Sequence, residues 1–71
     1  MIALSQASAG ETHEVTWIMG DLRQKNIINS IGITEGSSIT VVNSFLGSVI
    51  LTVNNMRYAL SNDLAFQIKM E

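Results

Sequence analysis

Cysteine is absent from the chain, so neither a disulfide framework nor a thiolate metal site can form, as is usual in a reducing cytoplasm. Cations are also scarce. Among 71 residues the formal net charge is −2, and the only lysines and arginines are Arg23, Lys25, Arg57 and Lys69. Such scattered cations cannot follow a phosphate backbone, so we expect no nucleic-acid partner.

Long apolar runs are missing as well. The longest, Val49 to Val53, has the length of a strand and is too short to cross a bilayer. Residues 1–5 lack the basic leader and apolar stretch of a signal peptide, so we expect a cytoplasmic protein that does not insert into the membrane. By contrast, 46% of the residues are hydrophobic and only 14% are charged, which argues against disorder. The length predicts one domain, residues 1–71, of marginal stability.

The spacing of the apolar residues predicts short strands separated by turns. We expect strands at residues 11–19, 38–43, 49–53, 56–60 and 66–70. Asn54 and Asn55 predict a tight hairpin turn, because asparagine tolerates positive φ. The polar corner at residues 61–63 predicts one turn of 3₁₀ helix with Ser61 as its cap.

One helix is expected between the first and second of these strands. Asp21 is typical of a helix N-cap, and Gln24 follows three residues later as in a capping box. Gly32 stands where a left-handed C-cap ends a helix, so the helix should cover residues 21–31. Short antiparallel strands close most naturally into a barrel without exposed edges. The sequence therefore predicts a mainly β fold, a small five-stranded barrel with one short helix.

No set of residues indicates catalysis, which requires a nucleophile beside an oriented base. His13 is the only histidine and Tyr58 the only tyrosine, and we expect neither an enzyme nor a cofactor. Alternation along a strand places Glu11 and His13 on one face and Glu14 on the other. Imidazole and carboxylate suit Fe(II) or Zn(II), but two side chains form a weak metal site at best. The other interpretation is a polar strand start that faces water.

Two large apolar residues lie where polar ones are the norm. Phe45 and Leu46 occupy a predicted connection beside Gly47. Such residues either mark a contact site or fold over an open barrel end as part of the core. Trp17 and Met19, in the first predicted strand, are expected in the core.

The order of these features resembles the FeoA family, small SH3-like domains of the ferrous-iron transport system. The resemblance covers nearly the whole chain. It rests on an ordered set of motifs: Leu4 and Gly10, then Val15, Ile18 and Gly20, then Ile31-Gly32-Ile33-Thr34-Glu35-Gly36, then Gly47, then Arg57-Tyr58-Ala59-Leu60, Ala65 and Ile68-Lys69-Met70. The chain lacks the prolines that usually precede the glycines at positions 10 and 36.

This resemblance implies a cytosolic helper of FeoB, the membrane ferrous-iron transporter with a GTP-binding domain. A surface that contacts FeoB is then expected to include Arg23, Lys25, Phe45, Leu46 and Arg57. Arg23 and Arg57 are either solvated cations or residues that act in trans on a partner's nucleotide.

Three alternatives stay open. The same barrel occurs as the C-terminal domain of metal-dependent repressors, where it needs a DNA-binding partner domain. The chain could instead carry Fe(II) or Zn(II) through His13 and Glu11. Small apolar-rich domains also often associate with a second copy of themselves.

Overall fold

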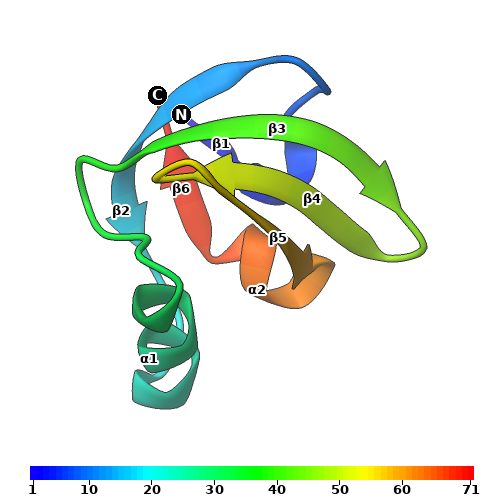
Figure 1. Cartoon of the computed structure of the whole chain (residues 1–71). Helices are drawn as coiled ribbons and strands as arrows, with labels where there is room; N and C mark the ends of the chain where they lie inside the picture. Colours follow the sequence, from blue (N-terminus) through cyan, green and yellow to red (C-terminus); the bar gives the residue numbers. More distant parts are fainter.

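The computed structural model describes all residues from Met1 to Glu71 and is dominated by one antiparallel sheet (Figure 1). In chain order the elements are β1 (Ile2–Ala3), the 3₁₀ helix η1 (Leu4–Gln6), β2 (Thr12–Ile18), α1 (Leu22–Ser30), β3 (Ser38–Phe45), β4 (Ser48–Val53), β5 (Met56–Ser61), α2 (Asn62–Phe66) and β6 (Ile68–Met70).

The six strands form a single strongly bent sheet in the order β1-β6-β2-β3-β4-β5. All neighbouring strands are antiparallel. The predicted small β architecture therefore holds, and two details differ from the five-stranded barrel. A sixth strand, β1, pairs with β6, and the sheet does not close between its edge strands β1 and β5. The mainly β architecture, with α1 between the first two long strands, is confirmed.

The core lies on the concave side of the bent sheet and is entirely apolar. Alternate residues of each strand point into it, as the period of a pleated strand requires. In β4 all three inward side chains are at most 1% exposed. The buried cluster consists of Leu4, Ala7, Val15, Ile28, Ile33, Ile39, Val41, Val49, Leu51, Val53, Leu60, Ala65, Ile68 and Met70.

The local signals for helix and turn are confirmed. At the start of α1, the Gln24 N–H donates to Asp21 Oδ1 at 2.8 Å and the Asp21 N–H donates to Gln24 Oε1 at 3.0 Å, which is the predicted capping box. Gly32 follows the helix with φ +90°. Asn54 and Asn55 form the two-residue turn between β4 and β5 with φ 52° and 64°. These features could be predicted because each depends only on residues that are neighbours in the sequence.

Two β-bulges change which side of the sheet the following residues face. One interrupts the register between Val15 and Trp17, and the other between Val41 and Asn43. An extra residue in a strand reverses the alternation beyond it, so inward-facing Val15 and Val41 are followed by outward-facing aromatic residues. Trp17 is 50% exposed and Phe45 is 63% exposed. The expectation that Trp17 belongs to the core is therefore wrong, and Met19 is only partly buried.

The last predicted strand also begins later than expected. Ser61 caps α2, whose Leu64 N–H donates to Ser61 Oγ at 3.3 Å, so the predicted cap is confirmed on a longer, α-helical turn. Phe66 belongs to this helix and is half-exposed. Only Ile68–Met70 forms the closing strand β6. The alternation of Phe66, Ile68 and Met70 predicts a strand over all five residues, but Phe66 ends α2 and Gln67 is its C-cap, so the strand is confirmed only for the last three.

Candidate interaction surface

The convex side of β3, β4 and β5 carries two of the predicted contact residues. Phe45 lies opposite Ser48 of β4, which lies opposite Ser61 of β5. Directly opposite residues point to the same side of a sheet, and so do alternate residues of one strand. Ser61 and Arg57 therefore share a side with Phe45. We call this side the outer face; its other members are Thr40, Asn43, Ile50, Thr52 and Ala59.

Leu46 extends the outer face at the β3–β4 turn. It forms a two-residue turn with Gly47, and both residues have positive φ, at 49° and 77°. Its side chain is 87% exposed, more than any other large hydrophobic residue in the chain. Neither Leu46 nor Phe45 folds over the end of the sheet as part of the core. The sequence left open whether these two residues are exposed or belong to the core, and the structure shows that both are exposed.

The predicted helix residues Arg23 and Lys25 lie in a different region. In Figure 1, α1 projects from one end of the sheet, and the β3–β4 turn lies at the other side of the molecule. Both cations are exposed. Lys25 lines a shallow pocket of about 390 Å³ together with Ile18, Asn29, Thr34 and Glu35. The five predicted contact residues thus form two separate groups, one on the outer face and one on α1.

A third exposed cluster was not predicted from the sequence. Lys69 lies opposite Trp17 across β2 and β6, and its Nζ lies 3.7 Å from the centre of the Phe66 ring. The same Nζ donates to the Phe66 carbonyl oxygen at 2.7 Å. The cluster depends on the bulge in β2 and on the short helix α2, and the sequence signalled neither the bulge nor the position of Phe66.

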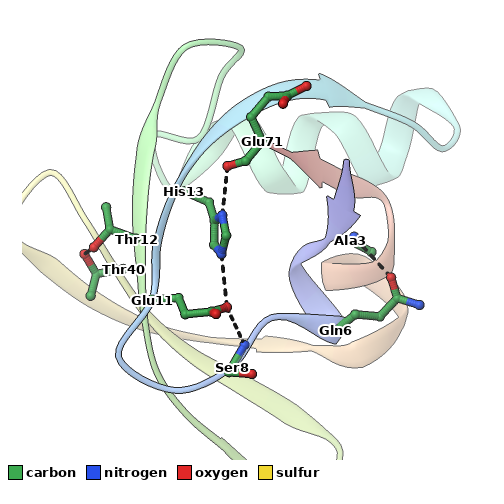
Figure 2. A network of polar contacts seen from close by, with 8 residues as sticks. All are labelled: Ala3, Gln6, Ser8, Glu11, Thr12, His13, Thr40 and Glu71. Carbon is green, nitrogen blue, oxygen red and sulfur yellow. Dashed lines mark hydrogen bonds and ion pairs between the residues drawn. The ribbon is translucent and has the colours of Figure 1, made fainter.

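His13 and Glu11 do come together as the alternation predicted. Figure 2 shows His13 Nε2 at 3.1 Å from Glu11 Oε1, and His13 Nδ1 at 2.8 Å from the main-chain carbonyl oxygen of Glu71. The Ser8 N–H donates to the same Glu11 oxygen at 2.9 Å. Ser8 lies outside β2 and Glu71 is far from His13 along the chain, so no sequence pattern connects either of them with His13.

Both ring nitrogens of His13 face oxygen acceptors, and only the doubly protonated imidazolium can donate to both. The hydrogen bond to Glu11 and then the one to Glu71 raise the pKa of His13. The Ser8 N–H, followed by the hydrogen bond to His13, lowers the pKa of Glu11. The His13 side chain is 19% exposed. The pair is therefore held in its charged form at mildly acidic pH.

The same geometry bears on metal binding. No group of three or more His, Cys, Asp or Glu side chains that could hold a metal ion is present. At Glu11 and His13 a cation would have two protein ligands and would have to displace the proton on Nε2, which the hydrogen bonds stabilise. Stable zinc sites use three or four protein ligands. The pair therefore has too few protein ligands for a stable metal site.

The charged pair predicts a pH dependence of stability. Because the pKa of His13 is raised above its ordinary 6.5, its contribution is fully present below pH 6.5 and is lost as the pH rises through the raised pKa. Because the pKa of Glu11 is lowered from 4.5, its contribution is present above pH 4.5 and is lost as the pH falls through the lowered pKa. Urea unfolding at pH values from about 3 to about 9 should show this window.

His13→Gln should flatten the fall in unfolding free energy on the alkaline side of the window. Glu14→Gln is the matched control, because Glu14 lies on the opposite face of β2 and should leave the dependence unchanged. An identical alkaline fall in the parent and in His13→Gln would contradict the assignment to this pair.

The bent antiparallel sheet, its short strands and the helical turn before the last strand define an SH3-like domain. The family model of the FeoA domain matches residues 2–71. The chain therefore belongs to the FeoA family, a family of small iron-transport accessory proteins, and the resemblance seen in the sequence is confirmed. No curated protein sequence matches the chain. No helix of the structure combines the length and the apolar content needed to cross a bilayer.

Solved structures agree with this assignment. An iron uptake regulatory protein (FeoA) is 28% identical, with a TM-score of 0.92 over 99% of this chain and 93% of its own. FeoA of Stenotrophomonas maltophilia, a prokaryotic SH3 domain protein solved with zinc, is 14% identical, with a TM-score of 0.85 over 100% of this chain and 91% of its own. A manganese-dependent transcriptional repressor is 22% identical, with a TM-score of 0.91 over 97% of this chain but only 35% of the repressor. The last two likenesses show the fold alone.

Proposed function

We propose that this chain is a cytosolic accessory protein of bacterial ferrous-iron uptake that binds the membrane transporter FeoB and does not itself catalyse a reaction. Family membership over residues 2–71 supports the link to iron transport. The observation that supports binding to a protein is the exposure of Phe45 and Leu46 at the tip of the β3–β4 hairpin.

The outer face provides what a small contact site requires. Aromatic and arginine side chains contribute most of the energy of many protein interfaces. Phe45 and Arg57 lie on one three-stranded surface, at its two ends, and Leu46 stands beside Phe45 at the β3–β4 turn. Because the sheet already fixes the backbone of Phe45 and Arg57, only side-chain conformational entropy is lost there when a partner binds. The partner surface is the cytosolic, GTP-binding part of FeoB.

Binding of the purified protein to the cytosolic part of FeoB, measured by calorimetric titration, tests this proposal. The double variant Phe45→Ser and Leu46→Ser should weaken binding at least about tenfold, because two apolar anchors leave the interface. Leu22→Ser is the matched control. Leu22 is also a large exposed residue, at 74%, but it lies on α1, away from the hairpin tip.

A second matched pair separates the two groups of cations. Arg57→Ala should weaken binding, whereas Arg23→Ala on α1 should not. If Leu22→Ser and Arg23→Ala abolish binding and the hairpin variants do not, the contact surface is α1 and the outer face is not used. If the unaltered protein fails to bind FeoB, the proposed function itself is wrong.

The likeness to metal-dependent repressors supports no second proposal. It rests on the fold, and this chain spans about a third of the repressor's length. This chain also carries only four lysine and arginine residues. The outer face contains a single cation, Arg57, and therefore does not support DNA binding.

A further inference from the structure

The strand β5 leaves one edge of the sheet open. It pairs with β4 on one side only, and α2 follows it at its end. The two-residue turn makes Val53 and Met56 a hydrogen-bonded pair, and such pairs alternate along an antiparallel ladder. The N–H groups of Arg57, Ala59 and Ser61 therefore point away from β4. The main-chain groups of Arg57 and Ala59 make no hydrogen bond elsewhere in the chain.

Edge strands usually carry a feature that prevents pairing with another chain, such as proline, a bulge or an inward-pointing charge. β5 has none of these. Its register with β4 is regular from Val53–Met56 to Ser48–Ser61, and the chain contains no proline. Ala59, in the middle of the free edge, is small and exposed. The edge is thus open to an added antiparallel strand.

The free groups of β5 are complementary to those of a second β5. When two copies pair antiparallel about Ala59, the Ala59 residues exchange N–H and C=O groups with each other. The Ser61 N–H of each copy then faces the Arg57 carbonyl oxygen of the other. These groups fall opposite one another because Arg57 and Ser61 are equally distant from Ala59. The Ser61 carbonyl oxygen is not among them, since Ser61 is the N-cap of α2 and its C=O accepts within that helix.

The charges fit the same pairing. Arg57 at one end of β5 and Asp63, two residues beyond the other end, are both exposed and have no ion-pair partner in the chain. Antiparallel pairing places Arg57 of each copy opposite Ser61 of the other. Asp63 follows Ser61 by two residues, which span at most about 7 Å. Asp63 of one copy therefore lies within reach of the Arg57 side chain of the other copy. A parallel arrangement would instead bring like charges together.

We infer that the free edge of β5 binds β5 of a second copy of this chain, forming a two-fold dimer centred on Ala59 with Arg57 facing Asp63 across the interface. The dimer extends the outer face of one copy into that of the other. It goes beyond the proposed function, because it requires only this chain and makes no use of FeoB.

Sedimentation velocity of the purified protein, from about 10 µM to about 1 mM, tests the inference. We expect reversible dimerisation, with the Ala59 and Ser61 amide protons becoming slower to exchange as the concentration rises. Ala59→Pro removes a donor that faces solvent in the single chain and should abolish the dimer while amide spectra show a folded domain. Ala59→Ser keeps the N–H and is the matched control. A monomer at all concentrations, or a dimer that survives Ala59→Pro, overturns the inference.

Charge reversal tests the arrangement with variants that leave the backbone intact. Arg57→Glu or Asp63→Lys alone should weaken dimerisation about tenfold, since each changes two symmetry-related pairs from attraction to repulsion. The double variant Arg57→Glu and Asp63→Lys should restore it to within about threefold. Single variants without effect, or a double variant no better than either single one, overturn the pairing. Dimers that dissociate only when Phe45 or Leu46 is changed would show an interface on the outer face instead.

Discussion

Replacing Leu51 by alanine should lower the free energy of unfolding by about 3 kcal/mol. Leu51 lies in the middle of β4, is 0% exposed and faces the centre of the apolar cluster. The loss combines the transfer energy of the removed methyl groups with the cavity that remains. Small domains have a total stability of only about 5 kcal/mol, so the variant should retain about 2 kcal/mol and unfold at a much lower urea concentration than the parent. Urea unfolding monitored by circular dichroism measures the effect.

Ile50→Ala is the matched control for this prediction. Ile50 is the preceding residue of the same strand, but its side chain is on the outer face and only partly buried. Its replacement should lower the unfolding free energy by less than about 1.5 kcal/mol. Equal losses in the two variants would contradict the assignment of the inner and outer sides of β4.

Replacing Gly32 by alanine should lower the unfolding free energy by about 2–3 kcal/mol. Gly32 ends α1 with φ +90°, a conformation that is strained for a residue with a Cβ atom. A Cβ at this position would lie 2.8 Å from Asn54 Nδ2. That nitrogen donates to the Gly32 carbonyl oxygen at 3.3 Å and connects the β4–β5 turn to the end of the helix. The variant therefore adds backbone strain and displaces a tertiary hydrogen bond.

Gly36→Ala separates these two effects. Gly36 has nearly the same φ, +91°, but a Cβ there would meet no atom within 4 Å. It should show the strain alone, about 1–2 kcal/mol. Asn54→Gly, which keeps the positive φ of 52° without strain, should then change little in the Gly32→Ala background, because the hydrogen bond is already lost. Equal losses in the two glycine variants would mean that the contact with Asn54 contributes nothing.

Features determined by neighbouring residues could be predicted from the sequence. Asp21 with Gln24 fixed the start of α1, Gly32 fixed its end, and Asn54 with Asn55 fixed the β4–β5 turn. In each case a backbone conformation or a short-range hydrogen bond selects the residue type directly. The same holds for the common face of Glu11 and His13, which requires only that the strand be regular over three residues.

Features determined by distant parts of the chain could not be predicted. β1 contains two residues, too few to show a period, and it forms only because Ile2 lies opposite Met70 at the other end of the sequence. The bulges in β2 and β3 leave no local mark, yet they decide that Trp17 and Phe45 face outward. A period of two, continued from Val15, placed Trp17 in the core. Tertiary pairing overrides such a pattern.

The candidate site shows the same division. The sequence singled out Phe45, Leu46 and Arg57, but only the register of β3, β4 and β5 shows that Phe45 and Arg57 share one face. It also grouped them with Arg23 and Lys25, which the fold places on α1. Ser8 and Glu71 joined the His13 network through the path of the main chain, which no residue type reveals.

The backbone conformation of Leu46 lowers the stability of the domain, although its side chain is exposed to solvent. Its φ of 49° is one that glycine or asparagine adopts at lower energy, as Asn54 and Asn55 do in the neighbouring turn. A chain under selection for folding alone would carry one of those residues at the hairpin tip. Keeping leucine there retains strain that no core contact offsets, since the side chain points into solvent. Leucine at this position therefore costs stability within the fold, and its loss during laboratory evolution for thermostability would be the sign of that cost.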